Sequence, residues 1–202
     1  QMIYDMITKE LPSKVVIDGK EVPINTDFRV GIQLDALLNS DMKDEERILK
    51  MLILYYPWIP KNLPEAIEKI LWFYGCGERV EEQEETKKRY VRKSTGEPAY
   101  SFSKDAAYIY AAFKEQYDID LTEIQDLHWW KFKALFDSLN EETQMKKIMY
   151  YRKVSTSGMD RDRRAYINEM KKLYSLSKDK KKMTLDQRNA SWIAYVKSRK
   201  QK

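Results

Sequence analysis

The stretch KVVIDGKEVPI, residues 14–24, contains the first clear structural signal in the chain and determines how the fold begins. Asp18-Gly19-Lys20 separates the runs Lys14–Ile17 and Glu21–Ile24, and Asp-Gly between β-branched runs indicates a hairpin. Pro23 has no amide proton to donate, so the second strand is expected at a sheet edge. Because an isolated hairpin is marginally stable in water, we expect this one to pack on the helices that follow.

Apolar residues recur at helical spacing from the end of the hairpin almost to the end of the chain. Residues able to cap a helix precede each of these segments: Asn25 or Thr26, Asp41, Asn62, Ser103, Asp120, Asn140, Asp160 and Thr184. After Asp120 we expect one helix with apolar residues from Leu121 to Leu135. The sequence therefore predicts a mainly α fold, in which an N-terminal β-hairpin packs on a bundle of about eight helices.

The composition is typical of a globular, mostly helical protein of a reducing compartment. The chain has 202 residues, of which 43% are hydrophobic and 34% charged, with only 6 Gly and 6 Pro. These values exclude collagen-like, disulfide-rich and wholly disordered chains and argue against an all-β sandwich. Cys76 has no second cysteine to pair with. No apolar run approaches the roughly 18–20 residues that span a bilayer, so no membrane partner is expected.

Charge is distributed unevenly along the chain. Residues 1–76 carry 9 Lys and Arg against 12 Asp and Glu, whereas residues 152–202 carry 16 against 5. This asymmetry points to an acidic partner, to nucleic acid or to the protein's own acidic face. The residues that we expect to make electrostatic contacts are Arg161, Arg163, Arg164, Lys171, Lys172, Lys181 and Lys182.

A highly charged stretch interrupts the helical pattern near the middle of the chain. We interpret residues 78–99 as a linker or a solvated helix extension. It would separate an N-terminal lobe of hairpin and helices, residues 1–77, from a C-terminal helical lobe, residues 100–176. Residues 177–202 would form a basic C-terminal helix or tail.

The chain lacks the residue patterns of an enzyme. His128 is the only histidine, so any catalytic triad would depend on it, and its neighbours Trp129 and Trp130 indicate a partly buried structural role. Gly75-Cys76-Gly77 lacks the lysine and hydroxyl of a phosphate-binding loop. Acidic pairs such as Glu45-Glu46 diverge on a helix rather than converge on a metal. We therefore expect no catalytic, cofactor-binding or metal-binding residues.

Aromatic residues are abundant enough to supply both a core and a binding surface. The chain contains 14 Tyr, 5 Trp and 9 Met, residue types that are favoured at protein interfaces and in adaptable helix-binding grooves. The aromatic residues that we expect to contact a partner are Tyr55, Tyr56, Trp58, Trp129 and Trp192.

Several strings in the chain resemble a family of long-tailed bacteriophage proteins. They include LPSKV at residues 11–15, LYYP at 54–57, LWFYGCG at 71–77 and LHWWKF at 127–132. The chain resembles the phage gene-product-fifteen family, encoded in the tail module beside the tape-measure gene. The resemblance covers about residues 10–176.

This resemblance implies a function without catalysis. Members are interpreted as tail-assembly chaperones that bind the tape-measure protein until tail-tube subunits polymerise around it. The expected location is the host bacterial cytoplasm, and the chain would be absent from the finished particle. Two alternatives remain open: a structural tail or connector component, and a sequence-independent nucleic-acid-binding protein that uses its basic C-terminal region. Self-association is also possible in each case.

Overall fold

The β-hairpin forms where the sequence predicts it, with a turn one residue shorter. The computed structural model describes residues 6–77 and 98–176, and in it β1 (Lys14–Ile17) pairs antiparallel with β2 (Lys20–Pro23). Lys20 therefore belongs to the second strand, and Asp18 and Gly19 form the turn in left-handed backbone, with φ of 49° and 70°. Two consecutive left-handed residues match the twist of the strands that they join.

The hairpin packs on helix α3 (Leu63–Tyr74) rather than standing alone. Val15 and Ile17 of β1 are buried. The turn is also tied to the start of α3, because the Asp18 amide donates to Glu65 Oε2 at 2.9 Å. Asn62 Nδ2 donates to Asp18 Oδ1 at 2.7 Å. The expected packing of the hairpin on helices is thereby confirmed.

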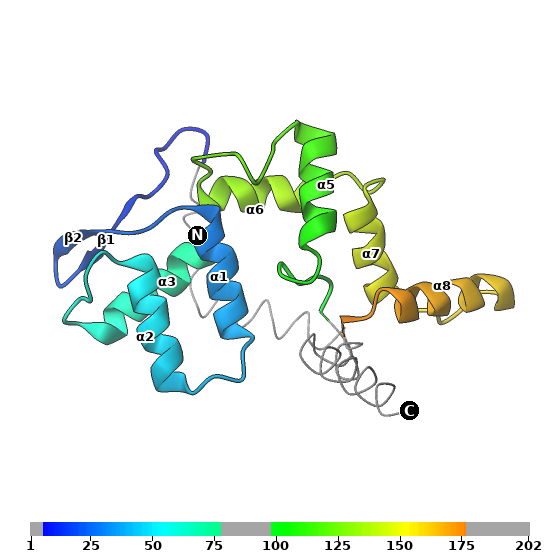
Figure 1. Ribbon diagram of the computed structural model, residues 1–202, viewed down its shortest axis with the longest axis horizontal. Coiled ribbons are helices and arrows are strands. Elements are labelled where there is room, and N and C mark those ends of the chain that lie inside the picture. Colours follow the sequence, from blue (N-terminus) through cyan, green and yellow to red (C-terminus); the bar gives the residue numbers. More distant parts are fainter. Residues whose placement is uncertain (1–5, 78–97, 177–202) are drawn as a thin grey trace, which may run out of the picture.

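Seven helices form in the described part of the chain (Figure 1). Besides α3 they are α1 (Phe28–Leu38), α2 (Asp44–Tyr55), α5 (Ala106–Tyr117), α6 (Trp129–Asp137), α7 (Gln144–Lys153) and α8 (Arg161–Leu173). The mainly α fold with an N-terminal hairpin is confirmed, and seven helices in this part compare with about eight expected for the whole chain. The helix expected after Thr184 and residues 78–97 lie outside the described residues.

Two of the predicted helix starts are correct. The Asn62 side chain accepts from the Glu65 amide at 3.3 Å and caps α3. The Asp160 carboxylate accepts from the amides of Asp162 and Arg163 and caps α8. In both places the cap accepts only from amides two or three residues further on, so the interaction can be inferred from local sequence.

Other helices begin later than predicted. Helix α1 is capped by Asp27, not by Asn25 or Thr26, and α7 by Thr143, not by Asn140. Asn25 and Asn140 instead accept from the amide two residues further on, at 3.2 Å and 2.9 Å. These Asx turns satisfy the side chain before the helix begins. The starts predicted at Asp41 and Ser103 are also wrong, because α2 follows Lys43 and α5 follows Asp105.

The largest difference concerns the helix expected after Asp120. Asp120 does not cap a helix: its carboxylate accepts from the Thr122 amide and hydroxyl, at 2.9 Å and 2.6 Å. Helix α6 begins only at Trp129. The Phe28 amide donates to the Leu127 carbonyl at 2.9 Å, and the Trp129 amide donates to the Thr26 carbonyl at 2.7 Å. This antiparallel bridge at His128 keeps residues 127 and 128 out of the helix, because the same backbone groups cannot also form helical hydrogen bonds.

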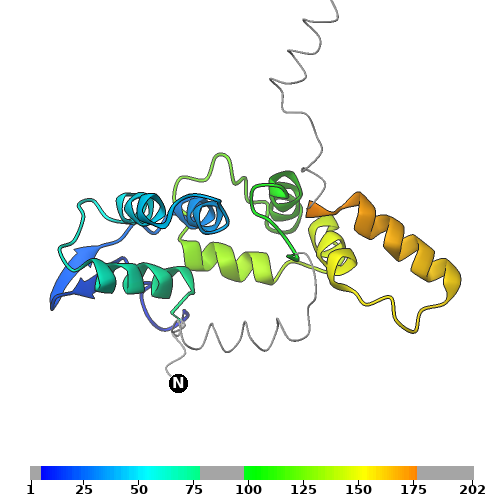
Figure 2. The same cartoon turned by 90° about the horizontal axis from the view of Figure 1, so that it is seen from below.

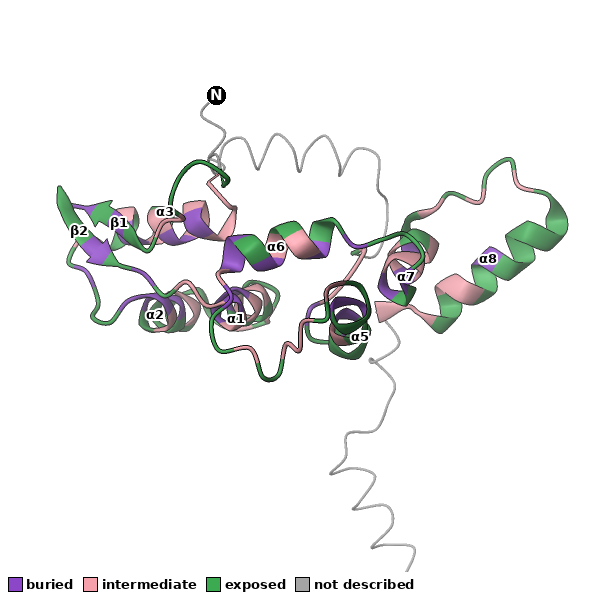
Figure 3. Ribbon diagram, turned by 90° about the horizontal axis from the view of Figure 1, so that it is seen from above, coloured by how far each residue is buried: buried purple, intermediate pink, exposed green. Residues whose placement is uncertain are grey.

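Five of the helices lie in two layers, seen along α1, α2 and α5 in Figures 2 and 3, and α7 and α8 lie beyond them at one end. Helices α1, α2 and α5 stand side by side in one layer, and α3 and α6 run across them in the other. The Phe28 ring of α1 stacks on the Phe132 ring of α6 at 5.0 Å. The Trp130 indole donates to the Phe73 carbonyl of α3 at 2.7 Å. Residues from both predicted lobes thus contribute to one hydrophobic core.

Candidate functional site

An apolar groove lies between α1 and α2. Its volume is about 450 Å³, and it is lined by Gln33, Ala36, Leu37, Lys50, Ile53 and Leu54. Four of the lining residues are exposed, whereas Leu37 is half-buried and Leu54 is half-buried against the core, so the groove borders the buried faces of the two helices. The groove is therefore an apolar surface in addition to the core.

Apolar side chains at this groove are exposed to an unusual degree. Ile53 is 60% exposed, and Leu49, one helical turn earlier on α2, is 48% exposed. The Lys50 ammonium contacts Glu46 at 2.8 Å, so the positive charge at the rim is already compensated. A contiguous apolar surface with polar groups at its edge is typical of a protein interaction site.

The predicted aromatic contact residues fall into two groups. Tyr55, Tyr56 and Trp129 are core residues, exposed by 1%, 4% and 1%. The Tyr56 hydroxyl donates to the Ala66 carbonyl at 2.8 Å, and burial raises the pKa of both tyrosines far above the ordinary value. Trp58, just after α2, is 57% exposed and can be reached by a partner as it stands. Trp192 lies outside the described residues.

The predicted basic residues lie on one helix where the structure describes them. Arg161, Arg163, Arg164 and Lys172 are exposed on α8 and Lys171 is half-buried, whereas Lys181 and Lys182 lie outside the described residues. None of the five on α8 forms an ion pair with another described residue. Within the described structure their charge is therefore not paired, although Arg163 helps to lower the pKa of the neighbouring Asp160 carboxyl.

His128 has a structural role in the described part of the molecule. Its Nδ1 accepts from the Trp130 amide at 3.1 Å, which makes it the N-cap of α6. The neutral ring then carries its proton on Nε2, which donates to the Pro12 carbonyl at 3.1 Å. Burial lowers the pKa of His128 from 6.5. Both ring nitrogens are thus engaged in holding the fold together, as the neighbouring tryptophans suggest.

Two further features of the described residues bear on the kind of site. Within residues 6–77 and 98–176, no three His, Cys, Asp or Glu side chains are grouped so that they could hold a metal ion. In the same residues, none of the helices combines the length and the apolar character needed to cross a bilayer.

Sequence reasoning missed the groove. Its apolar lining comes from Ala36, Leu37, Ile53 and Leu54, and none of these is among the aromatic residues that we expected to contact a partner. A signal was present, because Leu49 and Ile53 add a second apolar row to a helix whose core face is already complete.

Comparison with protein families identifies the class of protein. Residues 7–176 match the family described as bacteriophage Gp15 protein, so the molecule is a phage protein and the expected resemblance is confirmed. The chain belongs to the bacteriophage Gp15 protein family, which supports a structural or tail-related role. Comparisons with curated proteins and with solved structures found no match.

Proposed function

We propose that the protein is a non-enzymatic tail-assembly chaperone that binds the phage tape-measure protein in the cytoplasm of the infected bacterium. The observation that carries this proposal is the exposed apolar groove between α1 and α2. Membership of the Gp15 family supports a tail-related role, and the groove supplies a surface suited to a client.

The chemistry of the groove suits a helical client. A long amphipathic helix self-associates through its apolar face unless another surface covers that face. Ala36 leaves space on α1, and Leu37, Ile53 and Leu54 provide apolar contact. Covering the exposed 60% of Ile53 contributes about 1–2 kcal/mol of binding free energy. Several such contacts would add to the binding free energy of a client helix.

Co-expression tests the proposal. The chain, carrying an affinity tag, is produced together with the tape-measure protein of the same phage, and the recovered complex and the soluble fraction are measured. The wild-type chain should increase both. If neither a complex nor improved solubility is found, the chaperone function is wrong.

A pair of matched variants tests the groove. Ile53→Glu places a charge in the groove and should reduce recovery of the tape-measure protein by at least about tenfold, because about 1.4 kcal/mol is lost per factor of ten. Leu63→Glu is the control: Leu63 is also an exposed apolar residue, but it lies at the start of α3 in the other layer. Equal recovery with both variants would show that the client binds elsewhere.

Purified phage particles distinguish the structural alternative. A chaperone is released before the particle is complete, so mass spectrometry of particles should not find this chain. Its presence at a fixed number of copies would favour a tail or connector component.

A further inference from the structure

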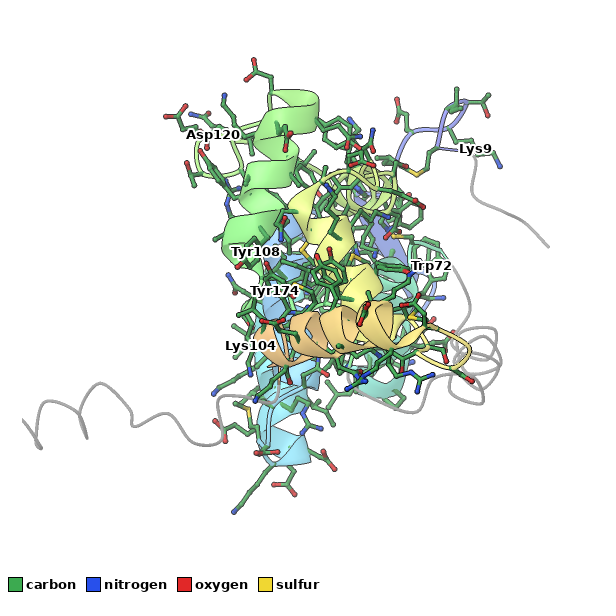
Figure 4. The ribbon with its side chains drawn as sticks, turned by 90° about the vertical axis from the view of Figure 1, so that its right-hand side faces the viewer. Lys9, Trp72, Lys104, Tyr108, Asp120 and Tyr174 are labelled. Atoms are coloured by element: carbon green, nitrogen blue, oxygen red, sulfur yellow. The ribbon has the colours of Figure 1, made fainter. Side chains whose placement is uncertain are left out.

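Helix α8 extends from one end of the molecule (Figure 1), where it packs on α7. Within the described structure, Ile167 is the one fully buried residue of α8, and most of the helix surface faces solvent (Figure 3). The helix is held mainly at its C-terminal end. There Arg152 Nε donates to the Tyr174 carbonyl at 2.7 Å, and Tyr174 lies beside Tyr108 of α5 (Figure 4).

One flank of α8 carries cations without interruption. Arg161, Arg164, Lys171 and Lys172, here called the basic stripe, fall within about 100° of the helix circumference at 3.6 residues per turn. The other residue in this arc is Asn168, which is also a hydrogen-bond donor. Asp162 and Glu169 fall outside this arc, about 60° to 80° beyond Lys172 by the same periodicity.

The charge of the basic stripe is not neutralised by the described protein. None of its four residues forms an ion pair there. Arg164 Nη2 donates to the Met159 carbonyl at 2.9 Å, which positions the guanidinium and leaves its charge in place. Within the described residues the stripe is therefore a row of positive charge without an ion-pair partner, in which the Arg164 guanidinium has a fixed position.

The composition of the stripe favours a phosphate backbone as the ligand over an acidic protein helix. An amphipathic helix would also present an apolar face, and the stripe contains no apolar residue to receive it. Phosphates need only cations and hydrogen-bond donors such as Asn. From Arg161 to Lys172 the stripe rises roughly 16 Å at 1.5 Å per residue. At about 3.4 Å per nucleotide, that length matches some five phosphates of one strand.

We propose that α8 is a sequence-independent nucleic-acid-binding helix whose basic stripe contacts the phosphate backbone. This activity is separate from the proposed binding of the tape-measure protein and does not depend on it. The two surfaces lie on different parts of the molecule, since the groove is formed by α1 and α2 (Figure 1).

Salt-dependent binding of the full-length chain to DNA tests this proposal. Fluorescence anisotropy is measured with a labelled 20-base-pair duplex and with a 20-nucleotide single strand between about 50 and 300 mM NaCl. R164E/K171E should weaken binding at the lowest salt at least about tenfold. It should also reduce the slope of log K against log salt by about 2 for duplex DNA, because each lost phosphate contact removes about 0.9.

The matched control has the same change of net charge at the other end of the molecule. K20E/K61E alters two exposed lysines near the hairpin that form no ion pair with a described residue, and it should keep the wild-type slope within about 0.5. If R164E/K171E unfolds, R164Q/K171Q replaces it, because removal of the two charges predicts the same loss of slope.

Three results would overturn the proposal. One is an unchanged slope and affinity in the stripe variant, and another is an equal loss in K20E/K61E. The third is competition by poly-L-glutamate as strong as that by unlabelled DNA, which would identify an acidic protein as the ligand. Binding to either DNA form that depends on the stripe supports the proposal, and comparison of the two forms shows which is preferred.

Discussion

Gly31 of α1 provides a sharp test of the packing between the two halves of the chain. Replacing a glycine by alanine within an ordinary helix stabilises a protein, but we predict that Gly31→Ala destabilises this one. A methyl group at Gly31 would overlap Cε3 and Cδ2 of Trp129 and lie 2.6 Å from Cζ3. Trp129 has no room to retreat, because its indole donates to the Tyr74 carbonyl at 2.8 Å and its ring stacks on Tyr74 at 5.3 Å.

The opposing contributions can be compared. Helix propensity favours Ala over Gly by about 1 kcal/mol. Overpacking of a filled core costs about 1–3 kcal/mol. If Trp129 moves, its hydrogen bond to Tyr74 is lost and two buried polar groups are left unpaired, at a further cost of about 1–3 kcal/mol. The expected loss of unfolding free energy is therefore about 1–5 kcal/mol, with a central value near 3.

Urea denaturation followed by circular dichroism measures this loss. Ala36→Gly, at an exposed position of the same helix, should cost about 1 kcal/mol and calibrates the helix propensity of α1. The double variant G31A/W129F should be more stable than the sum of its single changes predicts, because the smaller ring leaves space for the methyl group. A G31A protein as stable as the wild type would refute the close packing of Trp129 against α1.

Three further predictions concern buried polar groups. The Tyr55 hydroxyl is buried and has no hydrogen-bond partner among the described residues, so Tyr55→Phe should keep stability or raise it by about 1 kcal/mol. Tyr56→Phe removes the hydrogen bond to the Ala66 carbonyl and should cost about 1 kcal/mol. Urea denaturation measures both changes. Arg152 forms a fully buried ion pair with Asp105 at 2.7 Å. Arg152→Met leaves that carboxylate buried without its partner and should cost about 3–5 kcal/mol of unfolding free energy. The same change at exposed Arg163 should be nearly neutral, and thermal melts measure both. Burial lowers the folded-state pKa of His128 below 6.5, so the unfolded chain takes up the proton first as the pH falls. Stability should therefore decrease between about pH 7 and pH 5. His128→Asn retains a capping side chain and should abolish that decrease in pH-dependent melts.

The caps and the hairpin show how far local sequence determines structure. Asp-Gly at residues 18 and 19 specifies the turn, because left-handed backbone at two successive positions is accessible to few residue pairs. Asn62 and Asp160 are capping residues that accept from amides two or three residues further on, and both caps are found as predicted. Each of these interactions joins residues that are close in sequence, so no other part of the chain has to be known.

The start of α6 could not be obtained in this way. Apolar spacing from Leu121 to Leu135 fits one helix, but the backbone at residues 127–129 pairs with residues 26–28 instead. That pairing joins segments about a hundred positions apart, and local periodicity contains no information on it. The same limit applies to the candidate site: Tyr55 and Trp58 are both aromatic and three residues apart, yet one is 1% exposed and the other 57%.

The sequence by itself therefore determined the helical class, the hairpin and the family to which the chain belongs. Those features depend on residue type and short-range spacing, and the amino-acid sequence contains both. Tertiary structure decided which apolar residues form the core and which remain exposed, because burial depends on the surfaces that distant segments bring together. For that reason the groove between α1 and α2 and the uncompensated charge on α8 emerge only once the helices are packed.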